Sequence, residues 1–176
     1  MKLYCTTIHN QTGSDTVYAL LEYAFMAEFG DHLPEIKKTP NGKPFFPARP
    51  DIHFSLSHSK THVLCALSDA PVGVDIESPR QISKRAVRYF CSPEELALFD
   101  PLDLWVLKES YIKLIGETLP LVKELRFTRD GDMIATHDKS AAARLYSIDG
   151  CHVAVSTFDA NFPGSIVLIC GSLDLI

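Results

Sequence analysis

The sequence predicts a mixed α and β fold, formed by one globular domain or by two small halves that share a core. The chain has 176 residues, of which 46% are hydrophobic and 22% are charged, so it can bury a core and disorder is not expected. Short runs of alternating apolar and polar residues predict strands. Runs with apolar residues three and four positions apart, preceded by capping residues, predict helices.

The first part of the chain contains one expected helix among expected strands. Ser14 or Asp15 can cap this helix, and Gly30 is placed to end it. Asn41-Gly42 is a strong turn signal after a polar stretch. The segments that predict strands here are 2–8, 52–56 and 62–68.

The rest of the chain predicts capped helices followed by hairpins. Residues 83–90 predict a helix, and residues 92–95 form a capping box. Asp100 precedes a proline at the start of a longer helix, which Gly116 ends. The segments that predict strands are 73–77, 124–128, 133–136, 143–148, 151–158 and the apolar run 166–170, which has the length of a buried strand.

One strand and one helix each carry charged residues on a single face. Asp75 and Glu77 alternate with apolar residues, so their side chains point to the same face of the strand. Trp105, Glu109 and Lys113 are four residues apart and therefore share one face of the helix. If the strand and the helix pack together, three carboxylates and one ammonium group meet.

Such a cluster of carboxylates suggests a metal site. Carboxylates at close range repel one another unless some are protonated or a cation lies among them. Mg²⁺ typically uses one or two protein carboxylates together with substrate phosphates and water, so Asp75, Glu77 and Glu109 are candidate ligands. The alternatives are a solvated strand face for the two acids and, for Glu109 and Lys113, a surface pair worth about 0.2–0.5 kcal/mol.

Four short motifs follow one another in a specific order. Each alone is weak, but the order is informative: Gly42-Lys43-Pro44, Phe54–Ser59, Gly73–Glu77 and Trp105–Lys113. Together they resemble the 4'-phosphopantetheinyl transferase superfamily. Because the first two motifs precede Asp75, the chain is similar to the Sfp-type branch, in which one chain holds two similar halves, and not to the small trimeric carrier-protein synthases.

The resemblance implies a fold and an activity. The fold would be α+β, with residues 1–176 forming one domain of two pseudosymmetric halves, approximately 1–70 and 71–176, and an active site in the cleft between them. The activity would be transfer of 4'-phosphopantetheine from coenzyme A to a serine of an apo acyl or peptidyl carrier protein, with release of adenosine 3',5'-bisphosphate. In phosphoryl transfer, positioning and charge neutralisation dominate catalysis.

The resemblance also implies roles for the charged residues. Asp75, Glu77 and Glu109 would hold Mg²⁺ on the pyrophosphate, directly or through water. Glu109, or a water that it orients, is the candidate base for the carrier serine. Lys113 would steady the pyrophosphate and the departing phosphate. Lys108 matches the motif without a definite role.

Further motif residues would bind the donor. By resemblance, Lys43 and Pro44 lie against the adenosine end of coenzyme A, and Ser57 and His58 hydrogen-bond its phosphates. Charge-assisted bonds of this kind are short and strong. Taken alone, Lys43 also fits a solvated loop lysine and His58 a structural histidine near a turn.

The chain departs from the Sfp-type pattern before the first motif. Members of this branch usually carry a longer preceding segment with basic residues that grip the 3'-phosphate of coenzyme A. Only 41 residues precede Gly42 here, and Lys37 and Lys38 are the candidates to replace those residues.

Carrier proteins are commonly acidic around the modified serine, so an enzyme of net charge −5 needs a local basic patch to attract them. Lys84, Arg85 and Arg88 can lie on one helix face and supply it. The alternative is an ordinary solvated face.

Composition limits the remaining possibilities. The net charge of −5 argues against a nucleic-acid binder, and no apolar run approaches the ~18 residues of a membrane span. We see no signal peptide, and five cysteines without Cys-x-x-Cys spacing favour reduced thiols in the cytoplasm. We expect a monomer without nucleic-acid or membrane partners. Two other functions stay open: a coenzyme A or carrier-protein binding module with little or no transferase activity, and an unrelated Mg²⁺-dependent phosphohydrolase.

Overall fold

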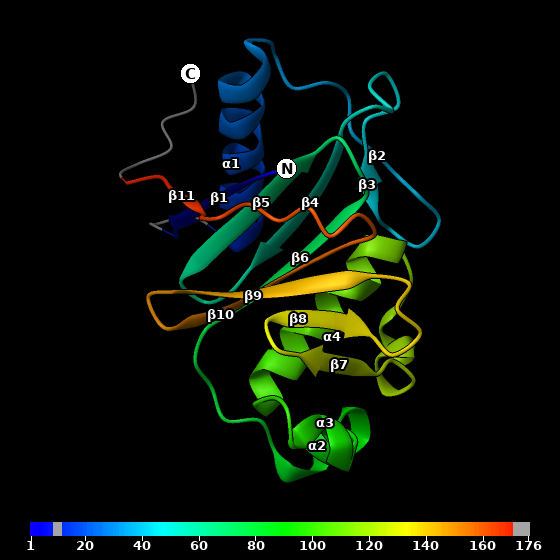
Figure 1. Ribbon diagram of the computed structural model, residues 1–176. Coiled ribbons are helices and arrows are strands. Elements are labelled where there is room, and N and C mark those ends of the chain that lie inside the picture. The colour runs from blue at the N-terminus through cyan, green and yellow to red at the C-terminus, as the bar shows by residue number, and fades with distance from the viewer. Residues whose placement is uncertain (9–11, 171–176) are drawn as a thin grey trace.

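Two β-sheets, each covered by a long helix, form the part of the protein that the computed structural model describes, residues 1–8 and 12–170 (Figure 1). In order, the strands of the first sheet are β11 (Val167–Leu168), β1 (Lys2–Thr7), β5 (His62–Ser68) and β4 (His53–His58). Those of the second are β6 (Val72–Glu77), β10 (Cys151–Thr157), β9 (Ala142–Ile148), β8 (Met133–Thr136) and β7 (Phe127–Asp130). The α+β class is therefore confirmed. No helix in the described ranges has both the length and the apolar character needed to cross a membrane.

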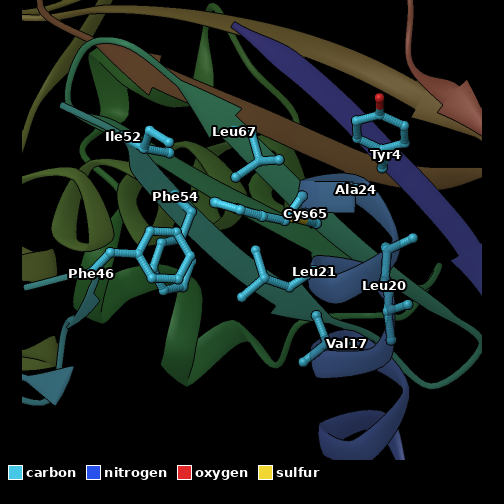
Figure 2. Close-up of a cluster of buried hydrophobic side chains, with 12 residues drawn as sticks. Tyr4, Val17, Leu20, Leu21, Ala24, Phe46, Ile52, Phe54, Cys65 and Leu67 are labelled. Carbon is cyan, nitrogen blue, oxygen red and sulfur yellow. The ribbon is translucent and has the colours of Figure 1, made fainter. Parts of the chain in front are cut away.

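Helix α1 (Gly13–Phe29) covers the first sheet and closes one hydrophobic core. Leu20, Leu21 and Phe25 are fully buried against side chains from β1, β4 and β5. Figure 2 shows this cluster, in which the rings of Phe46 and Phe54 stack with centroids 4.4 Å apart. Phe46 follows the Gly-Lys-Pro turn, so this core also anchors the loop that carries that motif.

The N-cap of α1 differs from the expected residues. Thr12 caps the helix, because its hydroxyl accepts a hydrogen bond from the backbone N–H of Asp15 at 3.1 Å. Ser14 and Asp15 therefore lie inside the first turn, and the prediction that one of them is the cap was wrong. Gly30 ends the helix in the left-handed region, at φ 65°, as expected.

The hairpin of β4 and β5 carries the Ser-His motif inside a strand. β5 has the expected bounds, but β4 continues to His58, which pairs with Val63. The sequence had suggested that Ser57 and His58 lie in the turn between the strands. They are instead paired residues within β4. A separate two-strand ladder, β2 (Lys37–Lys38) with β3 (Pro44–Phe45), presents the Gly-Lys-Pro turn.

The three α-helices between β6 and β7 begin at the expected residues, and the first and third of them also end where the sequence predicts. α2 (Lys84–Phe90) is capped by Ser83, and α3 (Pro93–Leu96) by a complete capping box between Ser92 and Glu95. α4 (Pro101–Ile115) begins after Asp100, whose side chain accepts from the N–H of Leu102, and ends at Gly116 in the left-handed region. These caps depend only on neighbouring residues, which is why the sequence predicts them well.

Two predicted strands differ from the structure. β7 begins at Phe127 instead of residue 124, because the 3₁₀ helix η1 (Leu119–Lys123) precedes it and the Leu125 carbonyl accepts a hydrogen bond from Lys108. The apolar run 166–170 is not a buried strand. Only Val167 and Leu168 pair, in parallel with β1 at the sheet edge, and their exposed fractions are 42% and 55%.

The two sheets meet edge to edge, along β4 and β6. Serine side chains of β4 join them, because the N–H of Val74 donates to Ser55 Oγ at 3.0 Å and the N–H of Ile76 donates to Ser57 Oγ at 3.3 Å. We call this contact the serine seam. The chain passes from the first sheet to the second between β5 and β6, and returns to the first sheet at β11. The expected pseudosymmetric halves therefore stay a prediction.

Candidate active site

Helix α4 lies directly on β6 because small residues separate them. A Cβ atom on Gly73 would lie 1.9 Å from the carbonyl oxygen of Ser110 and 2.4 Å from the backbone nitrogen of Leu114. Opposite Gly73 in the ladder is Ser156, whose hydroxyl lies 2.7 Å from that of Ser110. No larger residue fits at Gly73 without moving the helix.

This close approach brings the predicted strand face and helix face together. Lys113 Nζ lies 2.8 Å from Asp75 Oδ1, and the indole Nε1 of Trp105 donates to Glu77 Oε1 at 3.0 Å. Glu109 lies between Trp105 and Lys113 on the same helix face. Neither the strand acids nor the helix pair form a plain solvated surface.

Asp75 is the most enclosed of the acids, with 8% of its side chain exposed. Its Oδ1 atom accepts hydrogen bonds from Lys113 Nζ at 2.8 Å and from the Ser57 hydroxyl at 2.7 Å. Lys113 also donates to Ser57 Oγ at 2.9 Å. Asp75, Lys113 and Ser57 thus form a closed triangle at the serine seam.

Glu77 lies at the rim of the site, with 24% of its side chain exposed. Arg80 binds both of its carboxylate oxygens, at 3.0 and 3.2 Å, in addition to the bond from Trp105. The Trp105 ring packs edge-on against Phe90, with centroids 5.2 Å apart, which fixes the indole that orients the carboxylate. Glu77 is therefore more tightly bound to protein groups than the sequence suggested.

Glu109 is half-buried beside these charges. Burial, followed by the negative charges of Asp75 and then Glu77, raises its pKa from the ordinary 4.5 to about 7, although Lys113 acts in the opposite direction. A carboxyl group with this pKa is partly protonated at neutral pH, so it can exchange protons there.

The acids fit a divalent cation by their chemistry. Burial is the largest cause of the raised pKa of Glu109, and the charges of Asp75 and Glu77 add to it, so a cation among these acids would relieve their repulsion. Within residues 1–8 and 12–170, however, no three His, Cys, Asp or Glu side chains lie close enough together to hold a metal. The arrangement fits Mg²⁺ held by one or two carboxylates plus ligands from a substrate, and less well a closed three-carboxylate cage.

A cleft of about 320 Å³ opens next to this charged group. It lies between α1, the Gly-Lys-Pro turn, β4 and the C-terminal end of α4. The predicted site residues that line it are Lys43, Pro44, His58 and Lys113, together with Lys38 from β2. Lys113 contacts Asp75 and also lines the cleft, so it connects the two parts of the site.

Lys43 has a partner that the sequence did not predict. Its ammonium group donates to the backbone carbonyl of Leu114 in the last turn of α4, and Asn41 Nδ2 donates to the carbonyl of Gly116 at 3.1 Å. Burial lowers the pKa of Lys43. The Gly-Lys-Pro turn therefore caps the C-terminal end of α4, and the Lys43 ammonium is directed at the protein backbone.

Ser57 and His58 point to different surroundings, as neighbours on a strand do. Ser57 is buried and belongs to the triangle with Asp75 and Lys113. His58 is exposed and lines the cleft, and its ring lies so close to Gly13 that a Cβ there would be 2.6 Å from His58 Cδ2. Of the two, His58 is the one that a molecule in the cleft can reach directly.

Lys108 is a structural residue. It is fully buried, and its ammonium group donates to Glu95 Oε2 at 3.0 Å and to the carbonyls of Phe90 and Leu125. Glu95 in turn accepts from the N–H of Phe127 at 3.0 Å. This network ties α4 to α2, α3 and β7, one residue before Glu109.

Comparison with known proteins identifies the family to which the chain is similar. A model of the 4'-phosphopantetheinyl transferase superfamily matches residues 71–154. The chain is 33% identical over 145 residues to the 4'-phosphopantetheinyl transferase Sfp of Bacillus subtilis (strain 168). This match covers 73% of the present chain and 65% of the Bacillus protein. The chain belongs to the 4'-phosphopantetheinyl transferase superfamily.

Two other phosphopantetheinyl transferases match in the same way. The chain is 34% identical over 134 residues to the 4'-phosphopantetheinyl transferase psf-1 of Bacillus pumilus, covering 66% of this chain and 58% of that protein. It is 42% identical over 91 residues to the 4'-phosphopantetheinyl transferase gsp of Aneurinibacillus migulanus, covering 46% and 38%. The chain thus spans less than two thirds of the length of these curated relatives.

Several residues of this candidate site were missed in the sequence. Gly73 received no role there, although a glycine inside a strand is a known sign of close backbone approach. Asn41 and Arg80 gave no signal that distinguished them from ordinary turn and surface residues. Asn41 acts on a carbonyl 75 positions away, a contact that only the fold creates.

Proposed function

We propose that the protein transfers 4'-phosphopantetheine from coenzyme A to a serine of an apo acyl or peptidyl carrier protein and releases adenosine 3',5'-bisphosphate. The observation that carries this proposal is Lys113, which lines the cleft and contacts Asp75 beside the acid of raised pKa, Glu109. A cleft that ends at such a group suits a pyrophosphate whose bridging bond is to be broken. The superfamily membership supports the same reaction.

In the proposed reaction, the carrier serine oxygen forms a bond to the phosphorus that bears pantetheine. The bond from this phosphorus to the bridging oxygen breaks, and adenosine 3',5'-bisphosphate leaves with that oxygen. Glu109, directly or through water, takes the serine proton, a role that suits a carboxylate whose pKa is about 7. Lys113 would stabilise the leaving phosphate with its charge.

The donor would occupy the cleft. His58 and Lys113 would contact the phosphates, Lys43 and Pro44 the adenosine end through the turn that they form, and Lys38 the 3'-phosphate. Ser57 would reach a phosphate only after its hydroxyl leaves Asp75.

Asp75 and Glu109, with Glu77 directly or through water, would hold Mg²⁺. When bound, the cation would neutralise charge that develops on the phosphate oxygens. The carrier would dock near α2, where Lys84, Arg85 and Arg88 are exposed together with Tyr89.

Mass spectrometry of several apo carriers mixed with the protein, coenzyme A and Mg²⁺ tests the proposal. We expect the mass of phosphopantetheine on at least one carrier, and its loss in excess chelator or in Asp75→Asn. Asp132→Asn, at an exposed turn position, is the matched control and should retain activity.

Other outcomes favour the other functions. Tight binding of coenzyme A without modification of any carrier would indicate a binding module. Cleavage of coenzyme A without a carrier would indicate a phosphohydrolase.

A further inference from the structure

We propose that the Lys113 ammonium provides the positive charge at Asp75 before the donor binds, and that a divalent cation takes its place when the donor pyrophosphate is bound. The cation and the pyrophosphate therefore bind cooperatively. This inference rests on the proposed function, because it assumes that Asp75 is a cation ligand and that the donor occupies the cleft. It concerns how this chain's own residues control access to Asp75.

The contacts of Asp75 are the first step of the argument. Its Oδ1 atom already accepts two hydrogen bonds, from Lys113 and from Ser57, and the side chain is 8% exposed. An ammonium group and a divalent cation repel each other and compete for this oxygen. A cation that arrives alone, at either oxygen of Asp75, therefore meets the Lys113 charge beside a shielded carboxylate, where charge interactions are stronger than at the surface.

The second step is where Lys113 can go. Its side chain is 31% exposed and lines the cleft, so the ammonium group can turn toward a ligand there without moving the helix. A pyrophosphate in the cleft offers a negative partner that compensates for the lost contact with Asp75. The donor thus removes the competitor of the cation.

The third step is the Ser57 hydroxyl. It has one proton, which it donates to Asp75, and it accepts from Lys113 Nζ and from the N–H of Ile76. Ser57 is buried and does not line the cleft, so its hydroxyl stays on Asp75 when Lys113 turns away. Lys113 is therefore the group that moves from Asp75 to the pyrophosphate, and Ser57 keeps the carboxylate in place for the cation.

Thermodynamic linkage fixes the consequence. If the donor increases the affinity for the cation, the cation increases the affinity for the donor by the same factor. Couplings of this kind are commonly about 5–150-fold. The wild-type protein should therefore bind the cation weakly alone and at least about tenfold more tightly with coenzyme A present.

The test measures Mn²⁺ binding by the electron paramagnetic resonance signal of the free ion, without a carrier, so that no transfer occurs. Wild type, Lys113→Met and the exposed control Lys2→Met are titrated with and without coenzyme A, and protein-free titrations correct for chelation by coenzyme A. We expect Lys113→Met alone to bind Mn²⁺ about tenfold more tightly than wild type, and to gain less from coenzyme A. Lys2→Met should behave like wild type.

The outcomes separate this inference from the proposed function. Equal Mn²⁺ affinity of wild type and Lys113→Met, with binding abolished in Asp75→Asn, would overturn the role of Lys113 and leave the metal site standing. Binding that Asp75→Asn does not weaken, or no binding in any variant even with coenzyme A, would overturn both. Circular dichroism of each variant ensures that folded proteins are compared.

Discussion

Gly73→Ala tests whether close packing of α4 on β6 assembles the site. The new Cβ would lie 1.9 Å and 2.4 Å from backbone atoms of the helix, and Cβ contacts below 3.0 Å are essentially never tolerated. The helix would have to retreat by about 1 Å, since backbone atoms cannot rotate away as a side chain can. Overpacking typically costs about 1–3 kcal/mol, and we expect the upper end, about 3 kcal/mol.

Two measurements check this prediction. Thermal unfolding should show Tm lowered by about 6–12 °C, the range that about 3 kcal/mol gives for a chain of this size. Below that temperature, the folded variant should transfer phosphopantetheine about 100-fold more slowly, because a misplacement of 1 Å separates Glu109 and Lys113 from Asp75.

Gly164→Ala is the matched control, because a Cβ there meets nothing within 4 Å and the backbone has no positive φ. It should be unchanged or more stable by about 0.4–1 kcal/mol. If Gly73→Ala were as stable and as active as this control, the packing argument would be wrong.

Three further predictions concern the charges. Because the folded-state pKa of Glu109, about 7, lies above the ordinary 4.5, ionisation destabilises the fold as pH rises between these values. The stability advantage of Glu109→Gln over wild type in urea should therefore grow from pH 4.5 to 7 and then level off, and a constant difference would contradict the raised pKa. Lys38→Ala should lower the affinity for coenzyme A more than the affinity for 3'-dephospho-coenzyme A, and this difference should be smaller in Lys37→Ala, because Lys38 lines the cleft whereas Lys37 pairs with Glu35. Equal effects of Lys38→Ala on the two donors would refute the prediction. Replacing the basic residues of α2, Lys84, Arg85 and Arg88, with glutamate should raise KM for an acidic carrier at low salt and leave the affinity for coenzyme A unchanged. An unchanged KM would place the docking surface elsewhere.

Local patterns account for what the sequence predicted correctly. The common face of Asp75 and Glu77 follows from strand alternation, and the limits of α4 follow from Asp100 and Gly116, which act on adjacent backbone groups. The same reasoning misplaced the cap of α1, because several consecutive residues can act as caps and only the backbone geometry selects Thr12.

The partners of the site residues could not be predicted in this way. Lys43 donates to Leu114, 71 positions away, and Ser57 to Asp75, 18 positions away on another sheet. A motif indicates that such residues belong to one site, but it does not say which of them satisfy the backbone and which face a ligand. That division depends on packing between the sheets.

The serine seam has a consequence for the edge of the second sheet. β4 and β6 are both edge strands, and an edge with free N–H groups is a template for pairing with another chain. At β6, the hydroxyls of Ser55 and Ser57 occupy the N–H groups of Val74 and Ile76 without continuing a backbone ladder. The seam therefore covers this edge of β6 without a backbone ladder, and alanine at these two serines would leave two buried N–H groups without acceptors, at a cost of about 1–3 kcal/mol each.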